Sequence, residues 1–251
     1  MPLPFWTTLL PLLTAHLLAD FVFQTDEDVA RKHLPGILLK HVLIVTASSY
    51  VLLGRPDAWL PVVVIFSTHL IIDYLKIRIG RDKLTAFTVD QVAHLFVIAA
   101  LAAAPGVGSA SSLWGSSFGD GYYILLAFAS GVIVVIGVGA VVVGKAVDPF
   151  LLQMRSRHEE AKERPIPRHG FEQGGRLIGQ LERALILLFV LANQLSAVGF
   201  LIAAKSILRI GEVKDRSHRM EAEYIIIGTL VSFLWGLAAA FATQWMLGRV
   251  M

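Results

Sequence analysis

Long apolar runs constrain this chain more than any other feature of its sequence. Residues 121–144, 184–204 and 224–247 each approach the roughly 20 apolar residues that an α-helix needs to cross a bilayer. Charged residues make up only 16% of the 251 residues, against about 25% in a typical soluble domain. We therefore expect an integral membrane protein with an all-α fold, a polytopic bundle of transmembrane helices.

The charge distribution narrows the expected partners. The formal net charge is +3, but the basic residues lie in short segments between the apolar runs. This is typical of membrane-topology signals and not of a nucleic-acid-binding surface, so the bilayer is the expected partner and nucleic acid is not. The sequence has no cysteine, which excludes disulfides and thiolate metal sites.

The hydropathy pattern predicts eight helices, with six or seven as the alternative count. The predicted bounds are 4–24, 37–54, 58–77, 88–104, 121–144, 176–192, 196–210 and 221–247. An unbroken helix over 176–210 would be about 52 Å long, too long for a hydrocarbon core of about 30 Å. Because Asn193, Gln194 and Ser196 lie near its middle, we divide it into a hairpin.

The positive-inside rule predicts the orientation. Basic residues concentrate in segments 25–36, 76–87, 145–176 and 205–219. An N-terminus outside, together with the hairpin, places all four segments in the cytoplasm, where membrane proteins gather Lys and Arg.

The sequence predicts three regions. Residues 1–104 form a duplicated two-helix repeat, 105–120 a Gly/Ser-rich outer loop, and 121–251 a second transmembrane half. Within that half we interpret the charged segment 145–175 as a cytoplasmic loop, with room for an amphipathic surface helix.

The repeat has an offset of 53 residues. Three polar residues of the first hairpin recur in the second at this offset: His16, Asp20 and His41 as His69, Asp73 and His94. The offset also pairs Trp6 with Trp59 and Thr14 with Ser67 without a gap. Both copies start on the same side, which indicates a parallel duplication of one helical hairpin.

These polar residues are expected to gather at one depth. Positions i and i+4 share a face of a helix, so each His of the two H-x-x-x-D segments points the same way as its Asp. Gln24 ends the first helix on the side where the second and fourth helices begin with His41, Asp90 and Gln91. Ionisable residues inside a transmembrane segment cost a few kcal/mol and are candidates for a functional site.

Imidazole nitrogen and carboxylate oxygen are ligands of Zn²⁺, Mn²⁺ or Fe²⁺. The predicted metal ligands are His16, Asp20, His41, His69, Asp73 and His94. Two equivalent sets suit two ions about 3.5–4 Å apart, or one ion with outer partners. A buried His–Asp hydrogen-bond network without metal, and a proton or ion pathway, are the alternatives.

Basic residues in the second half form a further candidate cluster. Arg183 lies early in the sixth predicted helix, and Lys205 and Arg209 end the seventh. They suit a clamp for a phosphate or carboxylate. The alternative is that they form salt bridges at helix ends.

The segments "HLLADFVFQ", "HLIIDY" and "DQVAH" resemble the uncharacterised bacterial membrane family catalogued as domain of unknown function 3307. The second half, with "GRLIGQLERALILL", "GFLIAAKSILR" and "AEYIIIGTLVS", looks like the longer members of that family. The resemblance implies a bacterial inner-membrane protein and brings no activity. The placement of His and Asp in membrane helices is also loosely similar to that in inner-membrane proteins labelled metal-dependent hydrolases.

The leading hypothesis is a metal-dependent hydrolase that acts on a phosphate ester or a lipid-like substrate. Asp90 would be the general base or a further ligand. Gln24, Gln91 and the basic residues Arg183, Lys205 and Arg209 would bind the substrate. A metal-ion or proton transporter is the alternative, and a membrane scaffold that binds a cytoplasmic partner through 145–175 is the third hypothesis.

Overall fold

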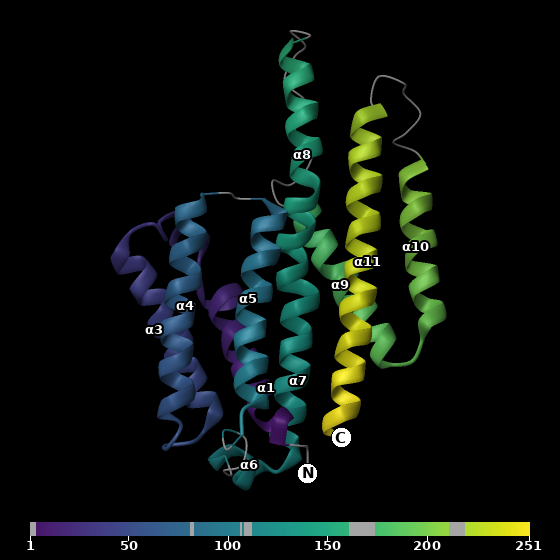
Figure 1. Ribbon diagram of the computed structural model, residues 1–251. Helices are drawn as coiled ribbons and strands as arrows, with labels where there is room; N and C mark the ends of the chain where they lie inside the picture. The colour runs from purple at the N-terminus through teal and green to yellow at the C-terminus, as the bar shows by residue number, and fades with distance from the viewer. Residues whose placement is uncertain (1–3, 81–82, 106, 108–111, 161–173, 211–218) are drawn as a thin grey trace. The chain divides into compact units, whose positions relative to one another are not determined.

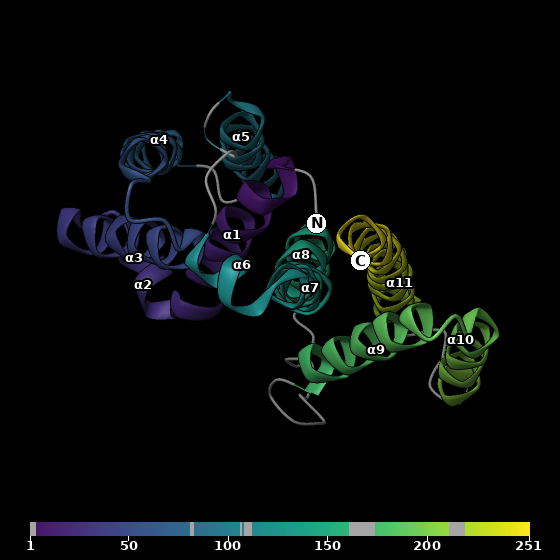
Figure 2. The ribbon, with the colours of Figure 1, turned by 90° about the horizontal axis from the view of Figure 1, so that it is seen from below.

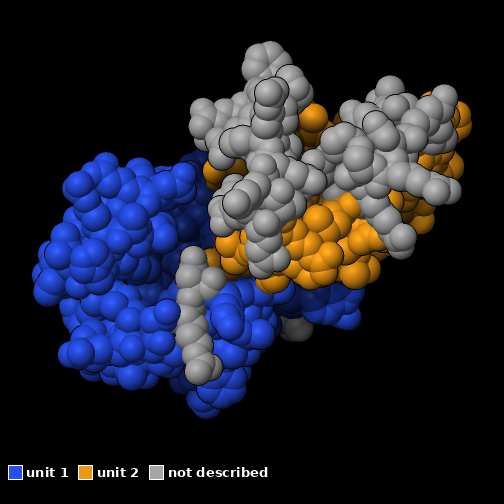
Figure 3. All heavy atoms as spheres, turned by 90° about the horizontal axis from the view of Figure 1, so that it is seen from above, with its two compact units in different colours: residues 1–133, 245–251 blue, residues 134–244 orange. Residues whose placement is uncertain are grey.

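The computed structural model describes residues 4–80, 83–105, 107, 112–160, 174–210 and 219–251 (Figure 1). Within these ranges helix is the only regular secondary structure, which confirms the expected all-α fold. The chain divides into two compact units, coloured separately in Figure 3. Unit 1 comprises Met1–Ile133 and Trp245–Met251, and unit 2 comprises Val134–Gln244.

Unit 1 is built around a ring of four long helices. Its elements are α1 (Pro4–Leu18), the π-helical turn η1 (Ala19–Phe23), α2 (Asp26–Ala30), α3 (Pro35–Leu53), α4 (Trp59–Ile79), α5 (Leu84–Ala103), α6 (Leu113–Phe118) and α7 (Asp120–Val132). Both α1 and α4 pack against α3 and α5, so the ring runs α1, α3, α4, α5 (Figure 2). Helices related by the 53-residue offset therefore lie diagonally across the ring.

The core of the ring includes side chains from all four helices. Leu12, Val45, Ile65 and Ile98 are buried together, and the offset of 53 relates Leu12 to Ile65 and Val45 to Ile98. Duplicated positions of the two hairpins thus meet in a single apolar core, which fixes the four helices around the polar residues beside it.

Local sequence signals set the helix ends of unit 1. Gly54 and Gly80 follow α3 and α4 with φ of 59° and 64°, a left-handed conformation that glycine adopts without steric cost. Thr25 and Asp28 form a reciprocal capping box at the start of α2, and Pro35 occupies the first turn of α3. These signals turn the chain back at both ends of the ring.

Unit 2 contains the remaining long helices. Its elements are most of the π-helical turn η2 (Ile133–Val138), α8 (Gly139–Glu160), α9 (Gly174–Leu191), α10 (Leu195–Ile210) and α11 (Arg219–Val250), whose last residues belong to unit 1. Helix α9 packs against α8 and α10. Asn193, with φ of 55°, lies in the short connection between α9 and α10.

Every predicted apolar helix is present, but fewer than eight qualify as membrane spans. In the described residues six helices are long and apolar enough to cross a bilayer: Pro4–Phe23, Pro35–Leu53, Trp59–Ile79, Leu84–Ala103, Asp120–Met154 and Ala222–Val250. Helix α9 falls short because it contains Arg176, Glu182 and Arg183, and the apolar part of α10, Leu195–Ile207, is too short. The structure therefore supports a multi-pass membrane protein with the smaller span count.

Two expected loops contain helix. Helix α8 continues through Lys145 to Glu160, so the first half of segment 145–175 is helical, and residues 161–173 lie outside the described part. The loop interpretation rested on the charge of the segment and on its prolines and glycines, Pro165, Pro167, Gly170, Gly174 and Gly175, all of which follow Glu160. Before Glu160 the segment has few helix breakers apart from Pro149. The short helix α6 lies within the expected outer loop 105–120.

Candidate metal centre

All four helices of the ring contribute polar side chains to one buried cluster in unit 1. His16 extends from α1, Asp20 from η1, His41 from α3, His69 and Asp73 from α4, and Asp90 and His94 from α5. All are buried except Asp20, whose side chain is still only 9% exposed. The structure thus brings together every His and Asp that the sequence singled out as a ligand or base.

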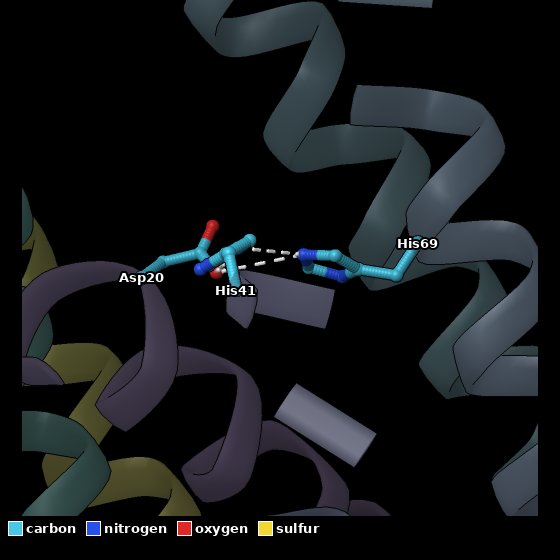
Figure 4. Close-up of side chains that lie close together, drawn as sticks. All are labelled: Asp20, His41 and His69. Atoms are coloured by element: carbon cyan, nitrogen blue, oxygen red, sulfur yellow. Dashed lines mark hydrogen bonds and ion pairs between the residues drawn. The ribbon is translucent and has the colours of Figure 1, made fainter. Parts of the chain in front are cut away.

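Asp20, His41, His69 and Asp73, referred to below as the tetrad, are the closest group. His41 Nε2 lies 3.0 Å from His69 Nε2. Asp20 Oδ1 lies 3.3 Å from His41 Nε2 and 3.8 Å from His69 Nε2, and Figure 4 shows these three side chains converging. Asp73 Oδ2 lies 3.5 Å from His69 Nε2 and 3.6 Å from His41 Nε2.

These separations fit a divalent metal ion. Two ligands that each lie about 2.0–2.1 Å from a tetrahedral Zn²⁺ are about 3.4 Å apart. Five of the six pairwise separations within the tetrad lie between 3.0 and 3.8 Å and bracket that value. Moreover, two imidazole nitrogens 3.0 Å apart cannot both present lone pairs unless a proton or a cation lies between them.

His94 and His16 border the tetrad, each with one ring nitrogen fixed. His94 Nδ1 donates to the backbone oxygen of Asp90 at 2.9 Å, and His16 Nε2 donates to Gln91 Oε1 at 3.2 Å. The other nitrogens, His94 Nε2 and His16 Nδ1, are buried and have no hydrogen-bond partner among the described residues. His94 also forms a candidate ligand group with His69 and Asp73, with ligand atoms within 4.8 Å of one another.

Gln91 connects the carboxylates of the cluster. Its Nε2 donates to Asp20 Oδ2 at 3.4 Å and to Asp90 Oδ2 at 3.2 Å. Because His16 donates to the Oε1 of the same amide, Gln91 orients groups from α1, η1 and α5 at once. Buried Oδ1 atoms of Asp20 and Asp90 accept no hydrogen bond in the described part of the chain.

Two lysines that the sequence analysis did not select contact the cluster. Lys32 Nζ lies 2.8 Å from Asp73 Oδ2, and Lys76 Nζ donates to Asp90 Oδ2 at 2.7 Å. Lys76 follows Asp73 by three residues on α4, a spacing that could have indicated it. Lys32 lies in a turn before α3, and no local pattern marks it.

Two hollows border the site. A small cavity of about 10 Å³ touches His16, His69 and His94, which is about the space that one water needs. A groove of about 540 Å³ lies between α4 and α5 and is lined by Ile72, Thr88, Val89, Val92, Ala93, Phe96 and Val97. Val97 lines both hollows, so the apolar groove and the histidine cavity share a wall.

The predicted substrate-binding residues divide between the units. Gln91 belongs to the cluster, whereas Gln24 follows η1 and its buried Nε2 has no hydrogen-bond partner among the described residues. Lys205, in unit 2, forms an ion pair with Glu182 at 2.5 Å. The side chain of Arg209 lies outside the described part of the structure.

Arg183 holds the π-helical turn η2. It donates from Nε to the oxygen of Val135 at 2.9 Å, from a terminal nitrogen to Ile136 O at 3.2 Å, and from the other to Ser232 Oγ at 3.0 Å. These hydrogen bonds use all three guanidinium nitrogens. Two of them satisfy backbone carbonyl oxygens of the π-helical turn, where the regular α-helical hydrogen bonds are interrupted. Arg183 thus has a structural role in unit 2, and its role in substrate binding stays a prediction.

Comparison with known proteins supports the resemblance found in the motifs. Residues 8–117, which include the whole cluster, match the family described as "Protein of unknown function (DUF3307)". No curated protein and no solved structure matches this chain. The family description names no activity, so any function is inferred from the chemistry of the site.

Proposed function

We propose that unit 1 binds a divalent metal ion in the tetrad and that the protein is a membrane-embedded, metal-dependent hydrolase of a phosphate ester. The observation that supports this most is the set of five nitrogen and oxygen separations in the tetrad, which match the ligand spacing of a tetrahedral ion. Four polar residues of low exposure, from η1, α3 and α4, would be costly in an apolar bundle without such a purpose.

One ion fits better than two. The two candidate ligand groups share His69, so two ions would need a ligand nitrogen each from the same ring. His94 and His16 would then be outer partners that orient the tetrad. The mixed nitrogen and oxygen donor set suits Zn²⁺, Mn²⁺ or Fe²⁺.

When bound, a divalent ion would polarise a phosphoryl oxygen and lower the pKa of a bound water. Asp90 Oδ1, a buried oxygen without a hydrogen bond in the described residues, is positioned to accept a proton. Gln91 and Lys76 hold the other oxygen of this carboxylate, which fixes the direction in which Oδ1 points.

The groove between α4 and α5 supports a lipid-like substrate. Six of its seven lining residues are apolar, and Val89, Val92 and Phe96 are largely exposed. An acyl chain in this groove would lie beside the wall of the histidine cavity. The distribution of basic segments supports an N-terminus outside and a site toward the cytoplasm. The bacterial inner membrane is proposed from the family resemblance alone.

Phosphate release by the purified, metal-loaded protein tests this proposal. We expect release from a small aryl phosphate or from short-chain phosphatidic acid, and its loss in Asp90→Asn with metal content unchanged. Lys40→Met, in which an exposed residue is replaced, is the matched control. Metal or proton flux in liposomes without any phosphate release would contradict the hydrolase and favour a transporter.

A further inference from the structure

Two ammonium groups lie at the boundary between the cluster and the exterior of unit 1. Lys32 pairs with Asp73 and Lys76 with Asp90, at 2.8 and 2.7 Å. The lysine side chains are 14% and 35% exposed, whereas those of the aspartates are 1% and 3% exposed. Each ammonium group therefore lies between a buried carboxylate and the exterior of unit 1.

Both lysines belong to the same end of the ring. Lys32 precedes α3 in the connection from α2, and Lys76 lies in the last turn of α4. Helices α3 and α4 are consecutive, pack together and are joined by a short turn, so the start of α3 is adjacent to the end of α4. The two cations thus approach the cluster from neighbouring helices.

Charge balance indicates what this end of the site would attract. Asp20, Asp73 and Asp90 contribute three negative charges and the two lysines two positive charges, so the cluster with neutral imidazoles has a net charge of −1. A single divalent ion in the tetrad would change this to +1. The ion would also engage Asp73, which leaves the donors of Lys32 available.

We propose that Lys32 and Lys76 form an anion subsite that holds a phosphate group beside the metal-loaded tetrad. This inference rests on the proposed function and names the residues that recognise its substrate. A lysine ammonium binds phosphate as a point charge with three donors, and two ammonium groups at the same end of the ring suit a doubly charged oxyanion. The phosphate belongs either to a lipid headgroup or to a free phosphate compound.

Calorimetric titration of the full chain with inorganic phosphate tests the subsite. The protein is loaded with Zn²⁺ in detergent, desalted to remove free metal, and assayed for metal content before titration. We expect Lys32→Met and Lys76→Met each to weaken phosphate binding about 10-fold or more while metal content is retained. Lys32→Arg keeps the charge and should bind within a few-fold of wild type.

Lys40→Met is the matched control, because Lys40 pairs with Asp28, on the surface of the α2 segment, and not with the cluster. It should bind phosphate as wild type does. Displacement of phosphate by short-chain phosphatidic acid would assign the subsite to a lipid headgroup, and binding without such displacement would assign it to a free phosphate compound.

The outcomes that contradict the subsite are separate from those that contradict the metal. A wild-type protein that holds no metal contradicts the proposed function and, with it, the subsite. Wild-type protein that holds metal but binds no phosphate contradicts the subsite alone. So do Lys32→Met and Lys76→Met variants that bind phosphate as tightly as Lys40→Met.

Discussion

At the scale of single residues, the site is less symmetric than the repeat that produces it. The offset of 53 makes His41 equivalent to His94 and His16 to His69, yet the tetrad includes only His41 and His69. The asymmetry has a local cause: Gln91, which holds His16, has Leu38 as its equivalent and thus no amide in the other copy.

This asymmetry predicts unequal effects for equivalent histidines. His41→Ala should abolish stoichiometric metal binding, because it removes a tetrad ligand. His94→Ala should retain the metal with an affinity about 10- to 100-fold lower, as for loss of an outer partner. Competition with a chelating dye measures both, and equal losses in the two variants would show that the site follows the symmetry of the repeat.

Replacing Arg183 distinguishes a structural role of this residue from a role in substrate binding. Arg183→Met leaves the backbone oxygens of Val135 and Ile136 without their donor, so we expect the free energy of unfolding to fall by about 2 kcal/mol or more. Metal content should stay at the wild-type level. Denaturant titration measures the free energy of unfolding, and elemental analysis measures the metal content. Unchanged stability together with weakened substrate binding would support the substrate-binding role expected from the sequence.

At the scale of elements, apolar runs predicted the helices well because burial in a bilayer demands length and hydropathy, and both are visible in sequence. The start of α5 at Leu84 was predicted four residues late, although its first turn is uncharged. The continuation of α8 to Glu160 was missed because its charged residues resemble loop composition. The π-helical turns η1 and η2 were not predicted. For η2 the reason is that a side chain from a distant helix, Arg183, satisfies its backbone.

An ion pair joins α9 and α10. Glu182 and Lys205 are largely buried and 2.5 Å apart, and Lys205 also lies over the ring of Phe233. Glu182→Gln alone should cost about 3–5 kcal/mol of stability by leaving a buried ammonium unpaired, and adding Lys205→Met should recover part of this loss. A double-mutant cycle of unfolding free energies tests it; strict additivity would mean that the pair contributes no coupling.

At the scale of the whole molecule, the sequence predicted the cluster but not its surroundings. Polar residues in apolar helices are conspicuous, and their duplication indicated which of them belong together. Lys32, Lys76 and the groove between α4 and α5 were not predicted, since their relevance depends on which helices become neighbours. The compact unit around the cluster also extends to Ile133, beyond the repeat that defines it in sequence.

The central claim, a metal ion held by the tetrad, is tested most directly by elemental analysis of the full chain purified without chelators. We predict about one divalent ion per chain in the wild type, its loss in His69→Ala, and its retention in His33→Ala, which changes an exposed histidine outside the cluster. Folded wild-type protein without bound metal, or equal metal content in the two variants, would contradict the claim.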